Sequence, residues 1–164
     1  MSKRLGSLGW ISLGCCCFFF FFSCTKKYPE QQFLQAERLH SEHRYQEEAE
    51  LYELMLQHTP QGPEGPRVAF RMAEIYERFL GDKAKGLEVY ASIADKWRGS
   101  PEAFAALERR AGIYEENEEY PLAVAEYEKL LDRGKSPHDK ILYRVASCHL
   151  KMKEFHRART SFFK

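Results

Sequence analysis

A set of small and aromatic residues recurs at fixed spacing along most of this 164-residue chain, and it restricts the fold more than any other feature. Counting from Ala111, tyrosines follow after three, nine and sixteen residues, an alanine after twelve and a leucine after nineteen. Related patterns begin at Ala36 and Ala146, and at Ala73 if the turn at residues 80–82 contains one extra residue. The four alanines are roughly 35–38 residues apart, a period typical of stacked helical units.

The residues between the breaks follow a helical period. Phe104, Leu107, Ala111 and Tyr114 fall on one stripe of a helix, and a second stripe follows the break at residues 118–121. No stretch shows sustained period-two alternation with β-branched residues. The sequence therefore predicts an all-α fold.

This spacing resembles the tetratricopeptide repeat. The resemblance covers residues 29–164 and implies a right-handed α-solenoid of about four helix-turn-helix units, because helix pairs this short must stack to bury their apolar faces. The expected units are 29–65, 66–103, 104–138 and an incomplete 139–164. Gln32, Gln35 and Glu48 stand where the first unit should be apolar, which suits a solvated terminal cap.

The start of the chain resembles a bacterial lipoprotein signal. Two basic residues, Lys3 and Arg4, precede an uncharged stretch at residues 5–22, and Ser23 and Cys24 follow. A basic start, an apolar run and a small residue before the cut are typical of a secretory signal. We expect removal of the signal at residues 1–23, acylation of Cys24, and a short tether at residues 24–28.

Other interpretations of this segment stay open. A cut before Cys15 would leave the phenylalanine run on the mature protein. The uncharged stretch is also close to the ~20 residues that span a bilayer, so it can serve as an uncleaved anchor with Lys3 and Arg4 in the cytoplasm. Simple secretion is the third possibility.

The composition excludes several classes of function. The chain has 25 basic and 24 acidic residues, and losing Lys3 and Arg4 with the signal makes the remainder slightly acidic, so there is no electrostatic case for nucleic-acid binding. Of its 5 cysteines, only Cys148 lies beyond Cys24. We therefore expect no disulfide framework and no cysteine metal cluster.

No motif predicts a catalytic, cofactor or metal site. His40 and His43 share a helical face but lack a third ligand. Gly81–Gly86 has the spacing of a phosphate loop without the Lys-Ser/Thr that completes one. The acidic run at residues 115–119 is typical of a solvated turn. Cys148 and the histidine after it point about 100° apart on a helix, so they form no dyad.

In the tetratricopeptide family, the first helix of each unit lines a groove that holds peptide segments. Positions −3, +1 and +4 relative to the small anchor share one helical face and should line this groove. They are Phe33, Glu37 and His40; Phe70, Glu74 and Glu77; Glu108, Gly112 and Glu115; and Tyr143, Ser147 and Leu150. This mixture of aromatics and carboxylates favours an apolar partner segment with Lys or Arg, unless the aromatics simply pack between helices.

The tyrosine spacing, with Trp-Arg-Gly-Ser-Pro at residues 97–101, is also similar in general terms to the D lipoprotein of the outer-membrane β-barrel assembly machine. The resemblance implies a non-enzymatic, lipid-anchored scaffold or adaptor of a bacterial envelope complex, on the outer membrane and facing the periplasm. Its partners would be envelope proteins and the membrane, with no nucleic acid and no cofactor. The alternatives are a chaperone-like module for unfolded or peptide substrates and a pilus or cell-division lipoprotein.

The fourth unit is expected to lack the polar capping helix that stacked repeats need. Phe155, Phe162 and Phe163 would then contribute to an exposed apolar surface. We expect either that the natural chain is longer or that this face is covered by a partner or by a second copy, which would make the protein self-associate.

Overall fold

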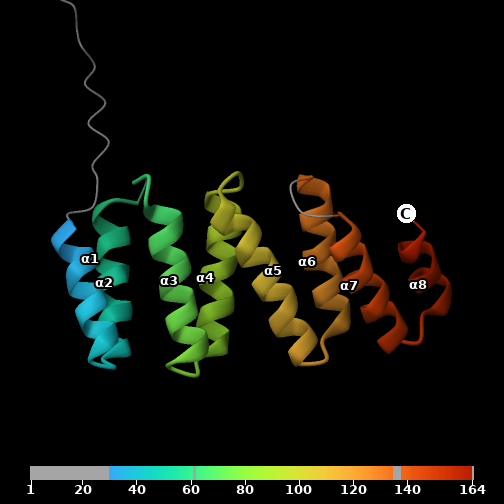
Figure 1. Ribbon diagram of the computed structural model, residues 1–164, viewed down its shortest axis with the longest axis horizontal. Helices are drawn as coiled ribbons and strands as arrows, with labels where there is room; N and C mark the ends of the chain where they lie inside the picture. The colour runs from blue at the N-terminus through green and yellow to red at the C-terminus, as the bar shows by residue number, and fades with distance from the viewer. Residues whose placement is uncertain (1–29, 61, 135–137, 164) are drawn as a thin grey trace, which may run out of the picture.

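The computed structural model describes residues 30–60, 62–134 and 138–163, and these residues form eight α-helices and no strand. In chain order the helices are α1 (Glu30–Ser41), α2 (Tyr45–His58), α3 (Gly65–Arg78), α4 (Lys83–Lys96), α5 (Pro101–Glu116), α6 (Tyr120–Arg133), α7 (His138–Lys151) and α8 (Phe155–Phe162). They stand side by side in a single row, each packed against the next, and α3 also contacts α5 (Figure 1). The expected all-α solenoid of helix-turn-helix units is confirmed.

The small anchors lie where consecutive helices touch. Ala36, Ala73, Ala111 and Ala146, each on the first helix of a pair, are 0% exposed. On the second helix of the second pair, a Cβ added to Gly86 would lie only 3.3 Å from the carbonyl oxygen of Ala73. The helix axes can approach this closely because the facing residues are small, so the repeat register read from the sequence matches the packing.

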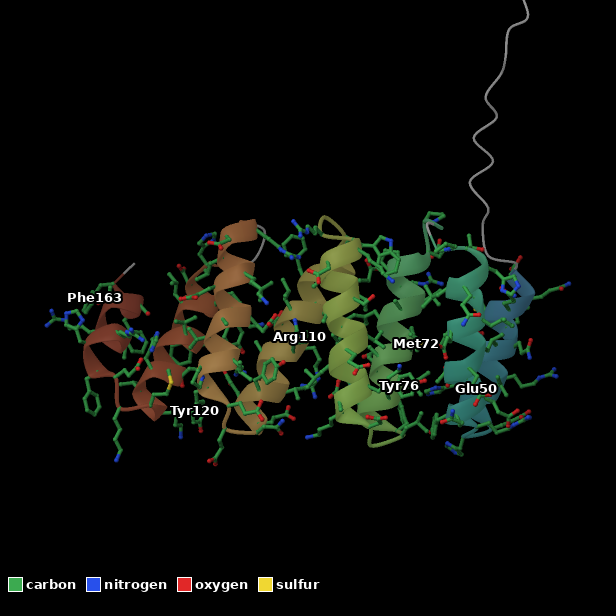
Figure 2. All side chains as sticks on the ribbon, turned by 180° about the vertical axis from the view of Figure 1, so that it is seen from behind. Glu50, Met72, Tyr76, Arg110, Tyr120 and Phe163 are labelled. Carbon is green, nitrogen blue, oxygen red and sulfur yellow. The ribbon has the colours of Figure 1, made fainter. Side chains whose placement is uncertain are left out.

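Larger side chains fill the space beside these small residues. Tyr52, Tyr90 and Tyr127 occupy equivalent positions on α2, α4 and α6 and are all buried. The equivalent residue of α8 is Phe162, which is 47% exposed, and Phe163 lies at the outer end of the row (Figure 2). The apolar exposure predicted for the last helix is therefore present, whereas self-association through it stays a prediction.

The first and second helices of each pair are joined by a turn that contains one residue with positive φ. These residues are His43, Gly81, Glu118 and Lys153, with φ of 57°, 70°, 62° and 61°. In three of the turns, the residue after it donates its N–H to a carbonyl five residues earlier, a bond that closes a helix C-terminus. The turn before α4 is one residue longer than the other three, as the repeat pattern that begins at Ala73 requires.

Two side-chain caps fix the start of the helices on either side of the second unit boundary. The carboxylate of Asp82 accepts the N–H of Lys85 at 2.9 Å at the start of α4, and the Ser100 hydroxyl accepts the N–H of Ala103 at 3.1 Å at the start of α5. α5 begins at Pro101, ahead of the unit start expected at residue 104. Proline is favoured there because the first helical residue needs no N–H partner.

Candidate protein-binding site between the first two helical pairs

A buried carboxylate connects the second and third helical pairs. Glu77 on α3 accepts a hydrogen bond from the hydroxyl of Tyr90 on α4 at 3.0 Å. It also accepts the Nε–H of Arg109 on α5, at 2.8 and 2.9 Å to its two oxygens. The side chain of Glu77 is only 3% exposed, so these donors replace the water that a carboxylate would otherwise bind.

The interface between the third and fourth pairs uses the same three residue types, but here the tyrosine is hydrogen-bonded to the arginine. Arg144 on α7 pairs with Glu115 on α5 at 2.6 Å, and its Nε–H donates to the hydroxyl of Tyr127 on α6 at 2.9 Å. The Sγ of Cys148 also donates to Glu115, at 3.2 Å. Burial raises the pKa of the Cys148 thiol to about 12, and the carboxylate adds to this, so the sulfur stays protonated as a donor.

The two interfaces use equivalent sequence positions. In each, the glutamate is the fourth residue after the small anchor, the tyrosine lies on the second helix of the same pair, and the arginine lies two residues before the next anchor. We call this arrangement the Tyr–Glu–Arg bridge. Its members are Tyr90, Glu77 and Arg109 at one interface, and Tyr127, Glu115 and Arg144 at the other.

The first interface has the tyrosine and the arginine of the bridge but not the glutamate. Tyr52 and Arg71 occupy their positions, and His40 stands where the glutamate should be. The Nδ1 of His40 lies 2.9 Å from the buried carboxylate of Glu48, and its ring lies edge-on to Phe79 at 5.3 Å. His40 is therefore held by its own helical pair and by the end of α3.

Arg71 is left without a partner across this interface. Among the described residues it forms an ion pair only with Glu74, at 3.3 Å and one turn further along α3. Its side chain is 68% exposed, against 29% for Arg109 in the complete bridge. An exposed ion pair within one helix contributes little to stability, so Glu74 holds Arg71 only weakly. The Arg71 guanidinium therefore has donors available for another group.

A cavity of about 620 Å³ opens at this incomplete bridge. Its wall comes from α1, α2 and α3 and combines apolar, acidic and basic groups. The lining residues are Phe33, Glu37, His40, Glu48, Tyr52, Arg67, Val68, Arg71, Glu74, Ile75, Arg78 and Phe79. Besides Arg71, two more guanidinium groups face it: Arg67 lies over the Phe33 ring at 5.0 Å, and Arg78 lies 3.6 Å from Glu74.

Comparison with known proteins supports the fold. Residues 67–100, which contain nearly all of α3 and the whole of α4, match the tetratricopeptide repeat family model. The fold is a tetratricopeptide-type solenoid. No curated protein matches the chain in sequence.

Three solved structures resemble most of this chain. A tetratricopeptide repeat protein from Parabacteroides merdae gives a TM-score of 0.65 at 19% identity, covering 82% of this chain and 50% of that one. A MamA RS-1 double mutant gives 0.58 at 14% identity, with 80% and 69% covered. MamA from Desulfovibrio magneticus RS-1 gives 0.57 at 15% identity, with 80% and 70% covered. This chain thus spans half the length of the Parabacteroides protein.

The cavity brings together only part of the groove predicted from the sequence. Phe33, Glu37 and Glu74 line it, together with His40. Phe70 packs against Tyr90 at 5.3 Å in the core.

The remaining predicted groove residues lie away from the cavity. Glu77 is buried in its bridge, and Glu108 is paired with Lys140 at 2.6 Å. Tyr143 is 62% exposed and contacts Phe162. Of the carboxylates expected along the groove, Glu77, Glu108 and Glu115 are thus paired with arginine or lysine. The basic partner segment expected from the sequence stays a prediction.

Sequence reasoning missed the arginines of the cavity. Arg67, Arg71 and Arg78 all lie on α3 outside the positions chosen for the groove. A signal was present, because arginine stands two residues before three of the four anchors, at Arg71, Arg109 and Arg144. Periodic arginine next to periodic glutamate indicates pairing between units.

Three further expectations concern parts of the chain away from the cavity. Cys24 and the expected signal and tether lie outside the described residues, so acylation stays a prediction. Within the described part of the chain, no helix is both long and apolar enough to cross a bilayer. In the same residues, no three His, Cys, Asp or Glu side chains come together as metal ligands.

Proposed function

We propose that this chain is a non-catalytic scaffold that binds a segment of another protein on the face formed by α1 and α3. Tetratricopeptide repeats generally serve as protein-interaction scaffolds, and the fold found here supports that general role. The observation that carries the proposal is the open cavity between the first two helical pairs, which exposes arginine and aromatic groups together. Such a mixture suits an extended peptide with both apolar and charged side chains.

The proposal includes a lipid anchor on Cys24 and a place in a bacterial envelope complex. The support is the sequence alone: a basic start, an uncharged stretch and a cysteine after Ser23. Two or more acyl chains would hold the domain at a membrane, where a single chain binds only reversibly. We place the domain on the outer membrane, facing the periplasm, as an adaptor of a protein-assembly complex.

Site-specific photo-cross-linking in intact membranes tests this function. A photoreactive amino acid at Glu37, which lines the cavity, should capture one or a few partners in near-stoichiometric amount. The same amino acid at Asp95, on the exposed surface of α4, is the matched control and should capture none of them. Many substoichiometric products at Glu37 would instead indicate a chaperone-like holdase, and identical products at both positions would contradict a binding site at the cavity.

A further inference from the structure

The two complete Tyr–Glu–Arg bridges indicate which chemical group Tyr52 and Arg71 can bind at the first interface. At both complete bridges, an arginine of the next pair binds a carboxylate and a tyrosine hydroxyl lies beside them. The hydroxyl of Tyr90 donates to Glu77, whereas that of Tyr127 accepts from Arg144. Arginine binds a carboxylate through parallel hydrogen bonds, so its position selects this group in geometry as well as in charge. The bridge is thus a carboxylate site built into the repeat.

The first interface keeps the arginine and the tyrosine of the bridge. Tyr52 and Arg71 both line the cavity, in the same repeat positions as Tyr90 and Arg109. Within the described residues, the Tyr52 hydroxyl has no hydrogen-bond partner of its own. Burial raises the pKa of Tyr52 to about 12, and nearby Glu48 adds to this, so the hydroxyl keeps its proton and can donate.

The acids of the chain that lie nearest do not fill this site. Glu48 is turned toward His40, and Glu74 is shared by Arg71 and Arg78 on its own helix. Glu37 lines the cavity without forming an ion pair among the described residues. The donors of Arg71 that Glu74 does not use therefore face an open volume rather than a buried carboxylate.

The wall around these donors suits the rest of an acidic side chain and its neighbours. Phe33, Val68, Ile75 and Phe79 supply apolar surface beside the arginines. Such surface can cover the methylene groups of a bound residue while its charged end reaches Arg71.

We propose that an aspartate or glutamate side chain of a bound partner segment enters this cavity and takes the carboxylate position that Glu77 and Glu115 occupy at the next two interfaces. Arg71 and Tyr52 donate to it, and the partner thereby completes the first bridge. This inference rests on the proposed scaffold function and specifies the chemistry of the partner. It differs from the basic partner segment that the sequence favoured.

The test is selection from a random peptide library on the full-length chain in detergent micelles. The peptides are displayed within a carrier protein, so that only side-chain carboxylates are available. Selected peptides should share an acidic residue at one position. A synthetic copy, blocked at both ends, should lose about tenfold or more in affinity when that residue becomes Gln, as expected for a hydrogen-bonded charge.

Variants of the protein assign this effect to the cavity. Arg71→Gln should lower affinity by a similar factor and should bind the acidic and amide peptides equally, whereas Arg98→Gln, in the exposed turn before α5, is the control and should change nothing. The double variant His40→Glu, Glu48→Ala should supply the missing carboxylate from within the chain without placing it beside the buried carboxylate of Glu48. It should weaken binding of the acidic peptide.

Three results would overturn the inference. They are selected peptides with no shared acid, an Arg71→Gln variant that still prefers the acidic peptide, and a His40→Glu, Glu48→Ala variant that binds like the wild type. In each of these cases peptides are still bound, so the scaffold function itself survives. A chain that selects no peptide, and that captures no partner by cross-linking at Glu37, contradicts both proposals.

Discussion

Arg109 on α5 donates hydrogen bonds to both carboxylate oxygens of Glu77 on α3, although the two residues are 32 positions apart in the chain. The pair joins consecutive repeat units at a place where the glutamate side chain is almost fully buried. Hydrogen bonds between arginine and carboxylate are directional, so this pair adds a geometric requirement to the close packing of small residues between helices. We therefore interpret the bridge as a device that fixes how one unit stacks on the next.

Breaking this pair should destabilise the domain. Arg109→Met leaves the Glu77 carboxylate buried without its cation, and we expect a loss of about 2 kcal/mol in the free energy of unfolding. Urea denaturation followed by circular dichroism measures this change. Lys140→Met is the matched control, because it removes an exposed pair with Glu108 and should cost less than about 0.5 kcal/mol. Equal losses would show that the bridge contributes no more than a surface pair.

The same carboxylate predicts a dependence of stability on pH. Burial alone would raise the pKa of Glu77, but the hydrogen bonds and charge of Arg109 outweigh it, so the pKa lies below its ordinary value of 4.5. A carboxyl group with a lowered pKa stabilises the fold above the ordinary pKa and loses this contribution as the pH falls through the lowered value. The difference in stability between the wild type and Glu77→Gln should therefore shrink as the pH falls from about 5 to about 3.

Urea denaturation at several pH values in this range measures that difference. Glu108→Gln serves as the control, because its carboxylate is exposed and its removal should leave the pH profile nearly unchanged. Parallel profiles for the wild type and Glu77→Gln would contradict the assigned role of Arg109.

The repeat register could be predicted from the sequence because it depends on local spacing. Ala36, Ala73, Ala111 and Ala146 each mark the point where two helices touch, and small residues there are visible without any knowledge of the neighbours. The extra residue in the turn that contains Gly81 was equally visible, because it shifts every later match by one position. Each repeat unit contacts only its neighbours, so such local signals are sufficient to predict where the helices pack.

The candidate site could not be predicted in the same way. Glu77 and Glu115 were assigned to the groove because each lies four residues after a small anchor, a position that lines the groove in the tetratricopeptide family. Their actual surroundings are set by Arg109 and Arg144, which come from the next unit and cover them. At the first interface, the decisive feature is that His40 stands in the position of the bridge glutamate. This can be recognised only after the other two bridges are known.

Acylation of Cys24 is a prediction about the segment before α1. A labelled fatty acid should enter the wild-type protein and not Cys24→Ala, which should accumulate as the uncut precursor. Cys15→Ala is the control for the rival cut and should be labelled normally. Gel mobility and label incorporation in whole cells measure both. Label on Cys24→Ala but not on Cys15→Ala would move the site to Cys15, and recovery only with the inner membrane would contradict the proposed location.

The positive φ of Glu118 predicts a stabilising substitution in the turn between α5 and α6. This exposed residue has φ 62°, a conformation that costs an L side chain energy and that glycine adopts without strain. Glycine also loses more backbone entropy on folding, so we expect Glu118→Gly to gain only about 0.5 kcal/mol. Glu119→Gly is the matched control, because its φ is −83° and glycine there should destabilise the turn. Thermal melts of the two variants should move in opposite directions, and a lower melting temperature for Glu118→Gly would mean that its side chain stabilises the turn in a way that outweighs the backbone strain.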